Sequence, residues 1–168
     1  MTAALDTRTV LRIVAYGTPG PQGSKTFKGR NRRTGKPVMV ESSEKVKPWR
    51  EAVQAAAMLA INDLPGDLRR QFPLDGPIAG RFVFTLRKPL SAPKTRRTWP
   101  TTYPDASKLL RSTEDALTKA GVWADDARIV DFDRLAKVFP GEDPEALDRP
   151  GVVIDLRRVT DLSAVSGG

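Results

Sequence analysis

Two residue types with reactive side chains, cysteine and histidine, are missing from the 168-residue chain. Their absence excludes disulfide bonds, zinc fingers, thiol nucleophiles, Ser-His-Asp triads and every imidazole base. Acid–base chemistry near neutral pH would therefore have to use Asp, Glu, Lys, Arg, Tyr or a metal-bound water. Any metal site must consist of oxygen ligands, which favours Mg²⁺ or Mn²⁺ over zinc.

Long apolar runs are missing as well. No stretch approaches the roughly 18 to 20 residues that a membrane span requires. Asp6 stands in the N-terminal stretch "MTAALDTRTV", where a secretion signal would be apolar. With 39% hydrophobic residues, the chain is expected to be a soluble cytoplasmic protein without a membrane partner, with one domain over residues 1–168 and frayed ends at 1–8 and 160–168.

Positive charge is in excess, because 28 Lys and Arg against 20 Asp and Glu give a formal charge of +8. This balance favours polyanionic partners, although a soluble protein with a charged surface could have the same total. Two segments crowded with Gly or Pro, 17–36 and 88–103, are expected to be basic loops, and the first is either a mobile loop or a loose hairpin. Their candidate anion-binding residues are Lys25, Lys28, Arg30, Arg32, Arg33, Lys94, Arg96 and Arg97.

Apolar periodicity predicts an α+β fold. Alternating residues indicate strands over 9–16, 37–41, 80–89 and 151–159. A further strand follows "VWADD". Within it Val130, Phe132, Ala136 and Val138 share one parity. Helical spacing indicates one helix from Pro48 and a second that Asp105 can cap and Gly121 ends. We therefore expect a mixed sheet of about four to five strands with two main helices packed on it.

Carboxylates gather in the second predicted helix and just after it, within "YPDASKLLRSTEDALTKAGVWADDARIV". Steps of three, three and four place Asp105, Lys108, Arg111 and Asp115 along one helix face. Intrahelical ion pairing explains the middle of this face equally well. The adjacent Asp125 and Asp126 could form an oxygen-lined divalent site with Asp105 if the strand folds back along the helix, or could be a solvated turn.

This stretch resembles the signature of RusA-type Holliday junction resolvases in their phage-like form. That signature reads P-D-x-D-[NK]-L-x-[KR], then D-A-L, then D-D at the start of a strand. The segments "GTPGPQGSK", "KPWR" and "AKVFPGEDPEALDRPGVVIDL" are also similar to the framing segments of that family, so the likeness runs from about residue 10 to 158.

The resemblance implies a homodimeric, Mg²⁺- or Mn²⁺-dependent endodeoxyribonuclease that binds branched DNA and cuts four-way junctions in recombination and repair, encoded by a phage or prophage. By position it makes Asp105, Asp125 and Asp126 metal ligands and makes Asp105, Asp126 and Arg111 catalytic. Lys108 would join the DNA-binding residues. Trp99 and Tyr103 could stack on bases at the branch point, with packing in the core or a dimer interface as the alternative.

Two positions depart from the family pattern. Ser107 stands where a second helix-start aspartate is expected, and a hydroxyl brings no charge to a metal. Arg111 replaces the usual lysine, which keeps the charge but removes any role that requires loss of a proton. Either neighbouring acids such as Asp115 compensate, or the chain is a catalytically weak or inactive protein that still binds branched DNA.

Overall fold

A four-stranded sheet forms the centre of the computed structural model, which describes residues 8–23, 25–41 and 44–160. Its strand order is β1 (Thr9–Tyr16), β6 (Gly151–Arg158), β4 (Ile78–Thr85) and β5 (Ile129–Val138). β6 runs antiparallel to both its neighbours, whereas β4 and β5 are parallel. The predicted mixed sheet of a single α+β domain is confirmed.

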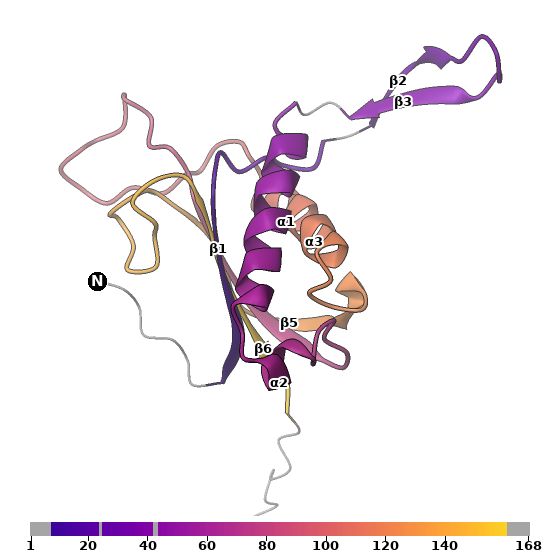
Figure 1. The fold of residues 1–168 in the computed structure, drawn as a ribbon. Coiled ribbons are helices and arrows are strands. Elements are labelled where there is room, and N and C mark those ends of the chain that lie inside the picture. The colour runs from indigo at the N-terminus through magenta and orange to yellow at the C-terminus, as the bar shows by residue number, and fades with distance from the viewer. Residues whose placement is uncertain (1–7, 24, 42–43, 161–168) are drawn as a thin grey trace, which may run out of the picture.

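Two helices cover one face of this sheet, α1 (Val46–Asn62) and α3 (Ala106–Lys119), and they lie side by side in Figure 1. The core between these layers is apolar and fully buried, because alternate residues of each strand point toward the helices. Its large members include Trp49, Trp123, Phe82, Phe84, Ile13, Ile154 and Leu156. A short helix, α2 (Gly66–Arg69), follows α1. No helix among the described residues is long and apolar enough to span a membrane.

The first basic segment forms a separate two-stranded sheet, β2 (Lys25–Arg30) with β3 (Pro37–Glu41). Figure 1 shows this hairpin projecting away from the helices and the central sheet. The second basic segment, residues 88–103, has no helix or strand and we call it the arm. The predicted fraying at 1–8 and 160–168 falls mostly on residues outside the described ones.

Strand β5 corrects one detail of the predicted pattern. Its pairing with β4 shifts register twice, so that Phe132 lies opposite Gly80 while Ala136 lies opposite Val83. These two partners are an odd number of residues apart on β4, and the ring of Phe132 contacts Phe82 on the helix-covered face. Phe132 and Ala136 therefore face opposite sides, because a bulge inverts the alternation that sequence parity assumes.

Candidate functional site

Helix α3 begins directly after Asp105, which occupies the N-cap position with an extended backbone. The expectation that its carboxylate caps the first turn is wrong, since the side chain accepts no capping hydrogen bond. It lies instead 3.8 Å from the Lys108 ammonium and is 59% exposed. The carboxylate thus makes no capping hydrogen bond to the backbone and is open to solvent at the start of the helix.

One face of α3 lines an open cleft of about 420 Å³. Ser107, Arg111 and Glu114 contribute to it at spacings of four and three, which place them above one another on the helix. Lys108 completes the helical wall, and Gln22 and Gly23 form the opposite side. The cleft therefore combines two cations, one hydroxyl and one carboxyl group.

The opposite wall is held in place by hydrogen bonds to α3. The backbone N–H of Gln22 donates to the Lys108 carbonyl at 2.9 Å, and the Ser112 hydroxyl donates to the Gly20 carbonyl at 2.6 Å. Arg50 of α1 donates to the side chains of both Gln22 and Asp115. Asp115 therefore has a structural partner 2.9 Å away and anchors this junction.

Asp125 and Asp126 lie at a short 3₁₀ helix, η1 (Asp126–Arg128), that leads into β5. The Asp125 carboxylate accepts a hydrogen bond from the Ala127 backbone N–H at 2.8 Å, as in an Asx turn. Asp126 opens η1, and both side chains are exposed. The turn expected as the alternative is thus present, and it leaves the Asp126 carboxylate without a capping role.

Glu114 is the acidic residue of this region that the sequence did not single out. Burial raises the pKa of its carboxyl from 4.5 to about 7, with further contributions from the nearby charges of Asp126 and Asp115, while Arg111 opposes them. Glu114 of α3 therefore lies within electrostatic range of Asp126 of η1. The spacing from Ser107 through Arg111 could have indicated it, but ion pairing within the helix explained Glu114 equally well.

The donors of this region suit a divalent ion by their chemistry. All of them are oxygen atoms, as Mg²⁺ and Mn²⁺ prefer, and Mg²⁺ often needs only one or two carboxylates beside its waters. Among residues 8–23, 25–41 and 44–160, no three acidic side chains stand close enough together to hold a metal. The site fits such an ion in ligand chemistry but is not closed around one.

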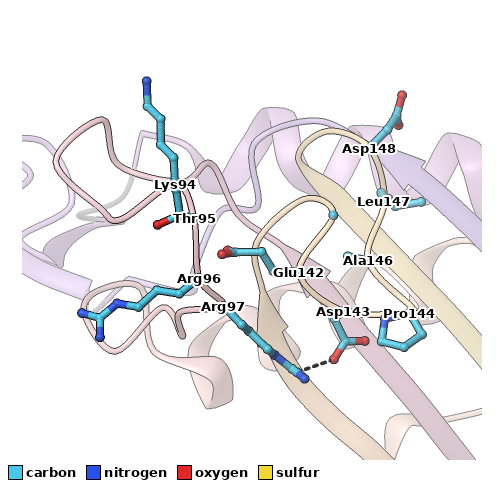
Figure 2. Close-up of a pocket in the computed structure, with 11 residues that line it drawn as sticks. Lys94, Thr95, Arg96, Arg97, Glu142, Asp143, Pro144, Ala146, Leu147 and Asp148 are labelled. Atoms are coloured by element: carbon cyan, nitrogen blue, oxygen red, sulfur yellow. Dashed lines mark hydrogen bonds and ion pairs between the residues drawn. The ribbon is translucent and has the colours of Figure 1, made fainter.

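The predicted DNA-binding cations lie in different surroundings. Lys28, Arg30, Arg32 and Arg33 are exposed on the hairpin, whereas only the backbone of Lys25 is described. On the arm, Lys94 and Arg96 are exposed and line one side of an open groove of about 790 Å³ (Figure 2). The other side of this groove is the loop 139–150, which connects β5 to β6.

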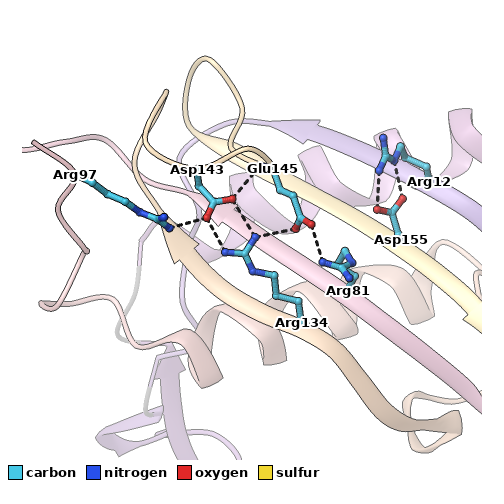
Figure 3. A network of polar contacts seen from close by, with 7 residues as sticks. All are labelled: Arg12, Arg81, Arg97, Arg134, Asp143, Glu145 and Asp155. Carbon is cyan, nitrogen blue, oxygen red and sulfur yellow. Dashed lines mark hydrogen bonds and ion pairs between the residues drawn. The ribbon is translucent and has the colours of Figure 1, made fainter. Parts of the chain in front are cut away.

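Arg97 differs from its neighbours because it pairs with this loop. Its guanidinium donates to Asp143 at 2.8 Å, as Figure 2 shows. Asp143 also accepts two hydrogen bonds from Arg134. Arg134 donates a further hydrogen bond to Glu145, and Glu145 accepts another from Arg81 (Figure 3). Arg134 holds the pKa of Asp143 down at about 2. This network fixes the arm against the sheet.

Comparison with known proteins yields one family. The model of the family described as Endodeoxyribonuclease RusA matches residues 17–156, a range that includes the cleft, η1, the hairpin and the arm. A search of curated protein sequences finds no match.

Proposed function

The chain belongs to the RusA endodeoxyribonuclease family, and from this premise we propose that it resolves four-way DNA junctions by hydrolysing phosphodiester bonds with Mg²⁺ or Mn²⁺. The observation that carries the proposal is that Glu114 of α3 lines the cleft together with the cations Lys108 and Arg111 and lies within electrostatic range of Asp126 of η1. Metal-dependent hydrolysis of a phosphodiester uses both: acids to hold a divalent ion and cations to offset charge on the phosphate.

We assign metal binding to Asp105, Asp125 and Asp126, the positions that match the family signature. Glu114 adds a carboxyl group to the cleft wall that holds Ser107, so it can supply charge that the serine lacks. When bound, a divalent ion would lower the pKa of water and neutralise charge at the scissile phosphate. Asp105 and Asp126 would orient the reacting groups, and Arg111 and Lys108 would bind the phosphate oxygens.

Affinity for DNA would come from the exposed cations of the hairpin and the arm. The hairpin continues from the loop that forms one wall of the cleft, so a DNA strand bound along it would lead into the proposed site. Phosphate contacts of this kind position the nucleic acid and carry no sequence information. The shape of the substrate would then decide where cutting occurs.

A homodimer is part of the proposal, because a four-way junction has near two-fold symmetry and two cuts require two sites. Sedimentation equilibrium of the purified protein checks it. A mass of twice 18.4 kDa is expected, and a monomer at micromolar concentration would contradict the dimer.

A second candidate function is binding of branched DNA without cleavage. Two observations favour it: serine at position 107, and the lack of three converging acids in the part of the chain that the structure describes. Such a protein would keep the hairpin and the arm, and hold junctions without cutting them.

One set of variants separates these candidates. Wild type, Ser107→Asp, Asp105→Asn and Asp126→Asn are incubated with a synthetic junction in Mg²⁺ and in Mn²⁺, and binding is measured in EDTA. If the protein is an active resolvase, the wild type cuts the junction. The cleavage rate then falls at least about 100-fold in both Asn variants, while both variants still bind the junction. Cleavage that appears only in Ser107→Asp would establish the binding protein instead.

A further inference from the structure

Of the three tryptophans, Trp49 and Trp123 are buried in the core, whereas Trp99 on the arm is 51% exposed. A large exposed ring beside cations has the two features on which a nucleic-acid strand can stack and pair its phosphates. We propose that Trp99 is a stacking platform for an unpaired base of the DNA, held ready by Arg97 and Asp143. This inference rests on the proposed function and names how it recognises a branch point.

One contact of the Trp99 ring is already made within the protein. The guanidinium carbon of Arg97 lies 4.0 Å from the ring centroid, which is close cation–π stacking. Half of the side chain nevertheless remains accessible, so the ring still offers surface to a ligand. A base placed there would complete a stack of guanidinium, indole and base.

The support behind this stack is unusually well fixed for a segment without regular structure. Arg97 donates to Asp143, whose side chain is only 3% exposed. Asp143 in turn accepts two hydrogen bonds from Arg134 of β5 and one from the Glu145 backbone N–H. Trp99 is thus ordered before DNA arrives, which lowers the entropic cost of binding.

The surroundings select a nucleic-acid strand as the occupant. Lys94 and Arg96 are exposed on the same arm and can bind phosphates, and the Tyr103 ring four residues on is also exposed. Two acids of the groove are engaged, since Glu142 pairs with Lys88 and Asp143 with Arg97, and the third, Asp148, lies 3.4 Å from the guanidinium of its neighbour Arg149. Stacking needs only the flat face of a base, which duplex DNA hides and a branch point or single strand exposes.

The test uses intrinsic fluorescence and affinity in EDTA, so that cleavage plays no part. Since Trp49 and Trp123 are buried, acrylamide quenching of the folded protein reports on Trp99. A four-way junction or oligothymidine is expected to quench Trp99 and shield it from acrylamide, and an intact duplex to do so far less. Trp99→Leu should weaken binding of the junction and single strand about tenfold, and of duplex less than twofold.

Two arginine variants test the support. Arg97→Lys keeps a cation for Asp143 but removes the planar group behind the ring, so single-strand binding should fall about three- to fivefold. Arg149→Lys, the same change at a guanidinium that stacks on the Tyr16 ring at 3.9 Å and lies outside the arm, should leave it within twofold. Wild-type junction affinity in Trp99→Leu, or an equal loss for duplex, would overturn the stacking site alone. A wild-type protein that binds no DNA would overturn the proposed function together with it.

Discussion

At the scale of single residues, two carboxyl groups show how environment decides the charge of an acid. Asp143 is enclosed by arginines and its pKa falls to about 2, so it stays ionised at any physiological pH. Glu114 is half-buried among other acids and its pKa rises to about 7. The first is suited to hold structure together. The second can gain or lose a proton near neutral pH.

Glu114→Gln tests the raised pKa in the absence of metal. Between pH 4.5 and 7 the folded protein retains a proton that the unfolded chain has lost, so the free energy of unfolding of wild type should fall as pH rises. The variant lacks this titration. It should match wild type near pH 4.5 and exceed it by about 1 kcal/mol at pH 8, a value discounted because the group is only half-buried. Urea unfolding in EDTA measures it.

An Asp126→Asn variant serves as the companion, because removing that charge should flatten part of the wild-type pH dependence. If wild type and Glu114→Gln show parallel stability curves from pH 4.5 to 8, Glu114 is an ordinary exposed acid. The electrostatic interaction between Glu114 of α3 and Asp126 of η1 would then be absent.

Asp143→Asn should destabilise the protein by about 2 kcal/mol at pH 7, since an amide can satisfy only part of the hydrogen bonds that Arg134 and Arg97 donate. The depressed pKa means that this stabilisation is present above about pH 4 and is lost as pH falls through 2. Urea unfolding at pH 7 checks the loss. Asp148→Asn on the same loop, where the side chain is 72% exposed, should change stability by less than about 0.5 kcal/mol.

At the scale of elements, strand β5 positions the start of α3. The Lys137 ammonium donates to the carbonyls of Thr102 and Pro104, both at 2.9 Å, and these residues lie three positions and one position before Asp105. The sheet therefore fixes the end of the arm next to Asp105, the proposed metal ligand. Loop anchoring of this kind transmits the rigidity of a strand to a site that lies outside it.

Lys137→Met should accordingly lower the rate of junction cleavage about tenfold, because small displacements of a reacting group are costly. Junction affinity in EDTA should change less than twofold. Lys119→Met, at the exposed C-terminal end of α3, is the matched control for loss of a charge. An equal loss of rate in both variants would show that total charge, and not the position of Asp105, sets the rate.

The sequence predicted the helices and strands better than the contacts between them. Strand β1 and helix α3 follow directly from local apolar spacing, and Val152, Ile154 and Leu156 are buried as their alternation indicated. Local spacing says nothing of bulges, so the side on which Phe132 lies was mispredicted. The roles of Glu114 and Asp143 were also missed, because both depend on partners from other elements.

At the scale of the whole molecule, the charge of +8 is distributed in a way that favours nucleic acid. Many acids of the described surface are paired with arginines, as in the network of Figure 3, whereas the hairpin cations are exposed. Binding should therefore weaken steeply with salt, because bound phosphates release their counterions.

A plot of log affinity for a junction against log salt concentration should have a slope of about −4 to −6, which corresponds to roughly four to six phosphate contacts. Replacing both Arg32 and Arg33 by Ala, at the hairpin turn, should make the slope shallower by about 2. Fluorescence anisotropy at about 50 to 300 mM salt measures the slope for the wild type and for the double variant. A flat response in wild type would exclude nucleic acid as the partner.

The most direct test of junction resolution maps nicks on a synthetic four-way junction labelled on each strand in turn, with wild-type protein in Mg²⁺ or Mn²⁺. Junction resolution by this protein predicts paired nicks on two opposing strands, placed symmetrically about the branch point, and none in an intact duplex. A junction that is bound tightly and remains uncut in both metals would contradict it, and would leave a protein that recognises branched DNA without hydrolysing it.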